Sequence, residues 1–294
     1  MGKNNSNIQV NMVEERTKGS VKSRRVVAYV VLSIACFFCL IWFYVLLINA
    51  TRYHGEIKSG FSAFPSKYLI YNLKNSLTGT KPILNGMINS IIISVGTAAL
   101  CVYFSTMTAY AIHAYDFKLK NAIFTFILAI MMIPTQVTAL GFLQLIDKMH
   151  MIDSFVPLIV PSIASPIVFF YIKQYMESSL PHELLEAARI DGAGEIRIYN
   201  TIVLPLMVPA MAVQAIFSFV SSWNNYFIPS LILNTDTKKT LPVLIAELRN
   251  TDYANNDLGK VYATIAFSIF PVIVIYLALS KFIVGGLAAG SVKG

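Results

Sequence analysis

Charged residues are scarce in this 294-residue sequence and are absent from long stretches of it. Only 13% of the residues are Asp, Glu, Lys or Arg, whereas 56% are hydrophobic. Six runs that together hold 160 residues contain no charged residue and no histidine, which excludes an ordinary soluble protein because its charges would be spread along the chain. These runs are 26–51, 82–112, 121–146, 154–172, 198–235 and 261–280.

Each run can cross a membrane once as an α-helix. A helix rises about 1.5 Å per residue and the hydrocarbon core is about 30 Å thick, so about 20 apolar residues span it. Strands of a membrane barrel would be shorter and would alternate in polarity, which these runs do not. We therefore predict an all-α membrane protein with six transmembrane helices, at residues 26–48, 88–112, 122–146, 155–175, 202–222 and 261–282.

Basic residues predict the orientation of the chain. The tail at residues 1–25 holds six Lys or Arg against two Glu, which favours a cytoplasmic N-terminus. The first span is longer than the core of a signal peptide, so we interpret it as a retained anchor. Six crossings return the C-terminal tail, residues 285–294, to the cytoplasm. The membrane domain between them, 26–284, is expected to have outer loops at about 49–87 and 223–260 and a cytoplasmic loop at about 176–205.

Several kinds of site have no counterpart in the sequence. The centres of the six spans carry no ionisable side chain, which argues against a carrier coupled to protons or sodium. No stretch matches the phosphate-binding loop of an ATPase or a catalytic or metal-binding motif, so we expect no enzyme and no cofactor in this chain. No basic patch with aromatic residues predicts nucleic-acid binding. The cysteines (Cys36, Cys39, Cys101) lie within spans, and the histidines (His54, His113, His150, His182) are scattered over different loops.

The most charged segment lies between the fourth and fifth spans, at residues 178–209. Ser179 can cap a short helix there, and Gly192 suits a left-handed turn at the end of that helix. The segment thus predicts a short helix, a sharp turn and a second short helix that enters the membrane at Leu204-Pro205. Such a helix could lie on lipid, but its polar side is acidic, and its adjacent alanines suit a cleft in another protein.

This segment resembles a known signature. Glu186-Ala187-Ala188, then Gly192, then nine residues and Ile202-Val203-Leu204-Pro205, is similar to the EAA signature of the membrane subunits of bacterial binding-protein-dependent ABC importers. Five stretches further resemble the carbohydrate-importing branch, and in particular the second permease of maltose and multiple-sugar importers. They are NSIIIS (89–94), MMIPTQV (131–137), EAARIDGAG (186–194), SWNNYFIP (222–229) and GGLAAGSVKG (285–294).

The resemblance implies an ABC type I importer permease fold in a bacterial cytoplasmic membrane. It also implies a second permease as heterodimer partner, two ATP-binding subunits that hold ATP and Mg, and an extracellular solute-binding protein that contacts the outer loop at about 234–260. Arg189 would either add to the ATPase contact or pair with Glu186. The implied coupling residues are Glu186, Ala187, Ala188, Arg189, Asp191, Gly192, Ile202, Leu204 and Pro205, and the implied tail contacts with the ATPases are Ser291, Val292, Lys293 and Gly294.

Polar residues within the spans are candidates for lining a transport path. Hydrogen bonding between helices is the alternative use of such residues, and we assign no sugar site, because in the resembled permeases sugar contacts lie mainly in the partner. An importer permease for a non-sugar solute is an alternative, and so is a stand-alone channel or carrier, which would leave the EAA pattern unexplained. The candidates are Thr135, Gln136 and Thr138 in the third span and Gln214 and Ser218 in the fifth.

Overall fold

The computed structural model of the chain describes residues 2–250 and 257–290, which form helices joined by short connections and contain no strand. Five helices in this part of the chain are long and apolar enough to cross a membrane, and they match five of the six predicted spans. These five helices cover Arg24–Ala50, Ile83–Ala114, Val156–Ser179, Glu195–Trp223 and Leu258–Phe282.

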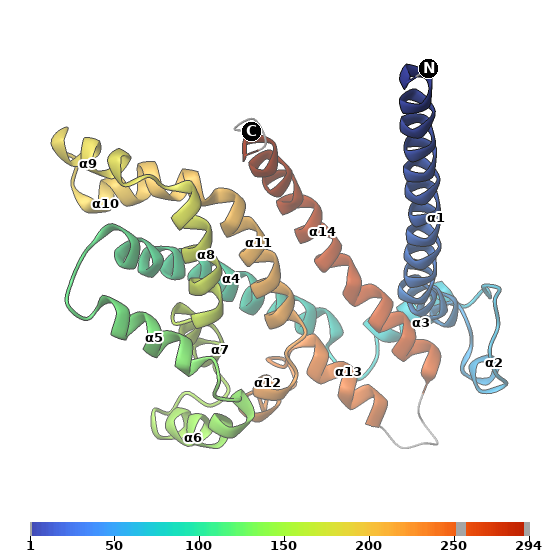
Figure 1. Cartoon of the computed structure of the whole chain (residues 1–294). Coiled ribbons are helices and arrows are strands. Elements are labelled where there is room, and N and C mark those ends of the chain that lie inside the picture. Colours follow the sequence, from blue (N-terminus) through green and yellow to red (C-terminus); the bar gives the residue numbers. More distant parts are fainter. Residues whose placement is uncertain (1, 251–256, 291–294) are drawn as a thin grey trace.

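The long helices carry the spans, and shorter ones connect them (Figure 1). Three spans use single helices, α1 (Gly2–Ala50), α4 (Ile83–Ala114) and α14 (Leu258–Gly290). Two spans combine several elements: α7 (Val156–Ile159), the 3-10 turn η1 (Val160–Ile163) and α8 (Pro166–Ser179) in one, and α10 (Glu195–Ile198), the π-helical turn η2 (Tyr199–Val203) and α11 (Leu204–Trp223) in the other. The connecting elements are α2 (His54–Lys58), α3 (Leu69–Leu77), α9 (His182–Ile190), α12 (Phe227–Ile232) and α13 (Leu241–Asn250).

The third predicted span differs from the prediction. Instead of one helix over 122–146, the chain forms α5 (Lys120–Ile130) and α6 (Thr135–Lys148), which are bent by 95° relative to each other. Pro134 stands directly before α6 in an extended conformation. Because proline has no amide hydrogen and disfavours helix in the residue before it, α5 does not continue into α6. The prediction of a continuous helix is wrong here, although the pair together still has the length and composition of one bent span.

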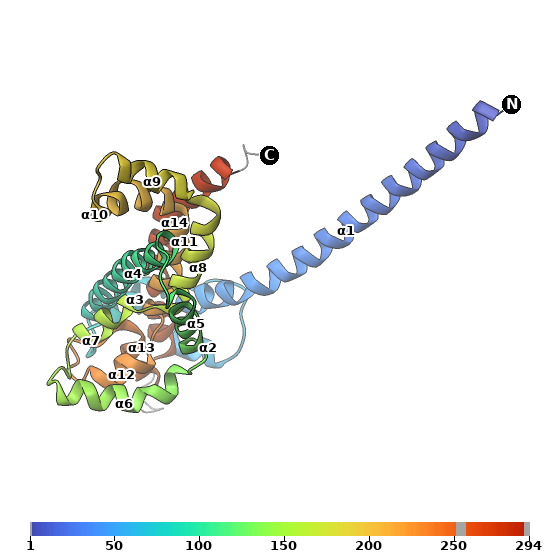
Figure 2. The ribbon, with the colours of Figure 1, turned by 60° about the vertical axis from the view of Figure 1, so that its left-hand side comes forward.

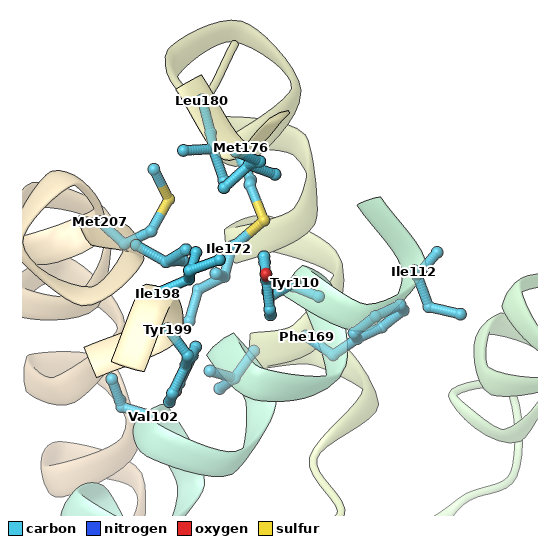
Figure 3. Packing of buried hydrophobic residues seen from close by; sticks show 14 of the residues in the cluster. Val102, Tyr110, Ile112, Phe169, Ile172, Met176, Leu180, Ile198, Tyr199 and Met207 are labelled. Carbon is cyan, nitrogen blue, oxygen red and sulfur yellow. The ribbon is translucent and has the colours of Figure 1, made fainter. Parts of the chain in front are cut away.

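The main core surrounds α4, which packs against α8 and α11. Figure 3 shows side chains of α4, α8, α10 and α11 meeting there, with Tyr110 of α4 close to Ile172 and Met176 of α8. Ile172 and Met176 are fully buried, and Tyr199 of η2 joins the same cluster. This core fixes the α9–α10 region to the membrane helices, because α9 also contributes two buried side chains to it.

The first helix stands apart from this core. Figure 2 shows α1 projecting away from the other helices, and most of its side chains from residue 24 to residue 47 are exposed. Between residues 24 and 50 the buried side chains lie at the C-terminal end, where Asn72 of α3 donates hydrogen bonds of 2.9 Å to the carbonyl oxygens of Ala50 and, just beyond α1, of Arg52. Gly259, at the start of α14, lies against this junction, because a Cβ atom there would be 2.6 Å from the Arg52 oxygen.

Gly259→Ala should destabilise the junction of α1, α3 and α14. A Cβ atom 2.6 Å from a backbone oxygen forces a backbone shift, which costs about 1–3 kcal/mol and outweighs the gain in helix propensity. Thermal unfolding of the detergent-solubilised chain should show a lower midpoint. Gly141→Ala in α6 is the matched control, because a Cβ atom at Gly141 meets nothing within 4 Å. Equal midpoints for the two variants would contradict the proposed close contact.

Candidate functional site

The segment with the EAA signature forms two short helices joined by a tight turn, as the sequence predicts. We call residues 176–205 the EAA loop. Gly192 has φ +78°, a left-handed conformation that favours glycine, and no heavy atom lies within 4 Å of its would-be Cβ. Gly194 follows in an extended conformation at the N-cap of α10, which begins at Glu195. Ser179 does not cap α9, because it is the last residue of α8 and Pro181 occupies the capping position.

The helix α9 is two-sided. Leu185 is 1% exposed and Ala188 is also buried, and both pack into the core around α4. Glu186 and Ala187 are exposed on the other side, and Ile190 is 85% exposed. Ala188 therefore points into this chain, whereas Ala187 and Ile190 present an apolar surface away from it. Asp191 and Gly192 are exposed at the turn that follows.

Arg189 forms a link between the EAA loop and α4. Its Nε donates a 2.8 Å hydrogen bond to Glu195 Oε1, and its guanidinium lies 5.1 Å from the ring centroid of Tyr115. The hydroxyl of Tyr110 donates a 2.6 Å hydrogen bond to the other oxygen, Glu195 Oε2. Arg189 thus pairs with Glu195 across the turn, and the expected pair with Glu186 does not form. We call the chain of contacts from Arg189 through Glu195 to Tyr110 the brace, because it links the turn to α4.

The end of the EAA loop enters α11 without interruption. Ile202 and Leu204 are partly buried against the main core, and Pro205 is exposed near the start of α11. A proline within a continuous helix removes one amide donor and crowds the carbonyl of the preceding turn. The π-helical turn η2 stands directly before Leu204, where it can accommodate this crowding.

The candidate path residues fall into two separate groups. Thr135, Gln136 and Thr138 are exposed at the start of α6. Gln214 and Ser218 of α11 instead line a cavity of about 790 Å³ between α4, η1, α8 and α11. The structure does not bring the α6 set to this cavity. Ser218 Oγ lies 3.6 Å from Cys101 Sγ, a weak hydrogen-bond pairing.

The outer segment before the last span is held at several points. Asn89 of α4 donates hydrogen bonds to the carbonyl oxygens of Thr237 and Lys239, at 2.9 and 3.0 Å. Lys81 and Lys239 both form ion pairs with Asp236 and with Glu247 of α13, at 2.6–2.9 Å. The described part of the predicted contact segment, 234–250 and 257–260, therefore contains an anchored turn and the helix α13. The predicted tail contact, residues 291–294, lies outside the described residues.

Asp153 anchors the same segment from the connection between α6 and α7. Its Oδ1 accepts hydrogen bonds from the amides of Asn234 and Thr235, and its Oδ2 accepts a 2.7 Å hydrogen bond from the Thr235 hydroxyl. Lys238 Nζ lies 3.2 Å from Oδ2. Partial burial raises the pKa of this carboxyl, but the hydrogen bonds from Thr235, Lys238 and Asn234 outweigh burial and lower the pKa to about 2.

Residues 102–287, more than half of the chain, match the family model described as the inner membrane component of binding-protein-dependent transport systems. The chain belongs to this family. The resemblance inferred from the EAA signature is thereby confirmed, and the protein is a membrane-spanning transport component with several helices in the membrane.

Two relatives and one solved structure extend this result. The arabinooligosaccharide transport permease AraQ of Bacillus subtilis (strain 168) is 38% identical over 70% of this chain and 72% of its own length. The melibiose/raffinose/stachyose import permease MelC of the same organism is 32% identical over 93% of this chain and 98% of its own. A bacterial ABC transporter for the acidic polysaccharide alginate contains a chain with TM-score 0.77 and 21% identity, covering 89% of this permease and 97% of that chain, which shows a shared fold.

Three places hold residues that the sequence analysis did not single out: the EAA loop, the cavity beside α11 and the outer segment. In the EAA loop, Ile190 and the 81%-exposed Ile196 widen the apolar surface. Their exposure shows this, whereas their spacing in the sequence does not. Tyr171 and Phe217 line the α11 cavity, and both read from sequence as ordinary apolar span residues. Asn89 was part of a family motif, and its polar side chain at the edge of an apolar run was the available signal for an anchoring role.

Glu195→Gln should loosen the EAA loop of the permease. The substitution removes the charge that pairs with Arg189, a partly exposed contact worth about 1 kcal/mol or less, so amide exchange in α9 and α10 should quicken up to about fivefold. Hydrogen exchange read by mass spectrometry measures this directly. Glu186→Gln, on the exposed side of α9 and beyond its first turn, should leave the exchange rates unchanged. Identical protection in both variants would refute the bracing role of Glu195.

The outer anchor should weaken in acid. The Asp153 carboxyl has its pKa lowered from 3.8 to about 2, so its stabilising contribution is complete above about pH 4 and is lost as pH falls toward 2. Amides of Asn234 and Thr235 should lose protection over this range, after correction for intrinsic exchange. In Asp153→Asn this transition should be absent. A wild-type transition that persists unchanged in Asp153→Asn would assign it to other carboxyls, such as Asp236 and Glu247.

Proposed function

We propose that this chain is one of two permeases in an ATP-driven importer of a sugar or oligosaccharide. The family match supports an importer, and the names of AraQ and MelC support a saccharide. The observation that carries the proposal is the EAA loop, which exposes Ala187 and Ile190 on one side and buries Leu185 and Ala188 in the chain's own core on the other.

The chain is oriented with both termini in the cytoplasm of a bacterial cell. The start of α1, the end of α14 and the α9–α10 region lie at one end of the molecule, while α6, α12 and α13 lie at the other (Figure 1). The six basic residues of the N-terminal tail favour the cytoplasm for the first of these ends. This orientation presents the EAA loop to cytoplasmic ATP-binding subunits.

Coupling works through contact and rigid connection. The exposed surface of α9 docks in a cleft of an ATP-binding subunit, which holds ATP and Mg, and no hydrolysis takes place in this chain. Movement of the docked helix passes to α4 through Arg189, Glu195 and Tyr110. It passes to α11 through the continuous helix that begins at Glu195. The brace makes the loop move with the membrane helices instead of folding aside.

The remaining partners occupy the other surfaces. A second permease completes the path, and Gln214 and Ser218 line this chain's side of it. An extracellular solute-binding protein contacts the anchored outer segment that begins at residue 234, where Asn234, Thr235 and Lys238 are exposed. A permease for a non-sugar solute would keep all of these contacts, whereas a stand-alone carrier would need none of them.

Purification from native membranes in mild detergent tests the assembly. Mass spectrometry of the bound proteins should identify a P-loop ATPase, a second permease with its own EAA signature and, after crosslinking, a solute-binding protein. Recovery of this chain alone, still moving solute in vesicles without ATP, would overturn the importer proposal in favour of a carrier.

Gly192→Val should separate the permease from its ATP-binding subunits. A β-branched side chain in the left-handed conformation costs about 1–2 kcal/mol, so docking should weaken about five- to thirtyfold. Co-purification of the ATPase and ATP-dependent uptake should both fall while membrane insertion is retained. Gly194→Val is the matched control, because Gly194 has φ −72° and ψ 154°, an extended conformation that suits valine. Normal uptake by Gly192→Val would refute the coupling assignment.

A further inference from the structure

The connection between α2 and α3, residues 59–68, carries two strongly exposed aromatic side chains. We call these residues the α2–α3 loop. Phe61 is 73% exposed and Phe64 is 80% exposed. A lone exposed apolar side chain is ordinary on a protein surface, but two phenyl rings three residues apart are costly to hydrate. The α2–α3 loop therefore favours an apolar surrounding outside the chain.

Hydrogen bonds fix the loop to Thr51 and Arg52, which directly follow α1. The Ser66 amide donates a 2.8 Å hydrogen bond to Thr51 Oγ1, and the Tyr68 amide donates a 2.9 Å hydrogen bond to the Thr51 carbonyl oxygen. The buried Arg52 donates a 3.0 Å hydrogen bond to the carbonyl oxygen of Gly60. Such bonds offset the conformational entropy that an ordered loop loses. The two rings are thus displayed from a fixed backbone.

The loop turns back beside the last turns of α1 (Figure 1). The hydroxyl of Tyr44 in α1 donates a hydrogen bond to the Ala63 carbonyl oxygen of the loop. Tyr44 lies six residues before Ala50, the end of α1, which is about 9 Å along the helix axis. The charge-free run 26–51 would extend about 39 Å as a helix, longer than the hydrocarbon core of about 30 Å. Without tilt, its last turns reach the headgroup region, and the loop lies beside them.

The charges around the two rings fit a membrane surface. Residues 57–80 contain three lysines and no Asp or Glu. Lys58 and Lys67 stand on either side of the two rings in sequence, and both are exposed. At a membrane surface, aromatic rings settle at the level of the headgroups, and lysine ammonium groups reach the lipid phosphates. Lysine is depleted from protein–protein interfaces, so a protein partner fits this segment less well.

We propose that the α2–α3 loop is an anchor in the leaflet where α1 ends, which is the outer leaflet in the orientation proposed above. Phe61 and Phe64 insert between the headgroups and the acyl chains, and Lys58 and Lys67 face the lipid phosphates. The anchor holds the end of α1 at a fixed depth. This hold matters because most side chains of α1 from residue 24 to residue 47 are exposed. The inference uses only the crossing of the membrane by α1, so it does not depend on the solute or on the coupling role of the EAA loop.

Spin labels measure the position of the loop in the bilayer. Phe61→Cys and Phe64→Cys are made separately, so that a folding defect in one variant leaves the other, in a chain with Cys36→Ser, Cys39→Ser and Cys101→Ala. The full chain, with the proteins that co-purify with it, is placed in nanodiscs of phosphatidylcholine and phosphatidylglycerol. Power saturation then compares relaxation by oxygen, which concentrates in lipid, with relaxation by a water-soluble nickel chelate. Both labels should respond to oxygen and be shielded from nickel.

The control label is placed at Asn234→Cys, which is exposed in the outer segment and should respond to nickel. Nickel access at Phe61→Cys and Phe64→Cys equal to that of the control would overturn the proposal, because the loop would then lie in water. Shielding from both reagents would also overturn it, since protein would then cover the rings. Shielding that arises only when a solute-binding protein is added would assign the loop to that protein and not to lipid.

The hold on α1 is tested at Leu47, which is 55% exposed near the end of that helix. Phe61→Ser combined with Phe64→Ser should raise the nickel access of a label at Leu47→Cys. The reason is that a more polar loop moves toward water and draws the end of α1 with it. Phe117→Ser, at an exposed position between α4 and α5, is the matched control and should leave nickel access unchanged. A label at Leu47 that does not respond to the double substitution would overturn the anchoring role.

Discussion

Hydrocarbon offers neither a hydrogen-bond partner to a backbone amide nor a counter-ion to a charge, and the arrangement of this chain follows from that constraint. The long apolar runs are helices because a helix pairs its amides within one segment. Ion pairs gather where helices end: Lys81 and Lys239 meet Asp236 and Glu247 at one end, and Arg189 pairs with Glu195 within the EAA loop at the other. The charged side chains thus lie at the ends of the helices, and the packing of the apolar helices sets the positions of those ends.

The EAA loop lies at one such end. The exposed side of α9 could move without displacing the membrane helices if its other side were not packed against them. Here Leu185 and Ala188 anchor α9 in the core, while Tyr110 holds Glu195 and Glu195 holds Arg189. The loop is therefore connected to α4 by packing and by hydrogen bonds at the same time. A displacement of α9 therefore also displaces α4, which it contacts in both ways.

Sequence reasoning succeeded where one local rule decides the outcome. Runs without charge located five spans, and the EAA spacing identified the loop and its left-handed glycine, because each depends on neighbouring residues alone. It failed where two rules compete or contacts are distant. Hydropathy favoured one helix across Pro134, whereas the proline backbone ended it. The partner of Arg189 lies six residues away across a turn, beyond the spacing of helical pairs, and the cavity joins helices that are far apart in sequence.

The helix that begins at Glu195 joins the two sites. Its first turn belongs to the EAA loop, and its middle carries Gln214 and Ser218 at the cavity. Motion at the exposed end therefore reaches the cavity along one element, with the π-helical turn and Pro209 as the places where that element can bend. Because the cavity wall holds no charged residue among those described, such bending moves no ion through a region of low dielectric. A displacement of α9 can then rearrange the helices around the cavity without separating an ion pair there.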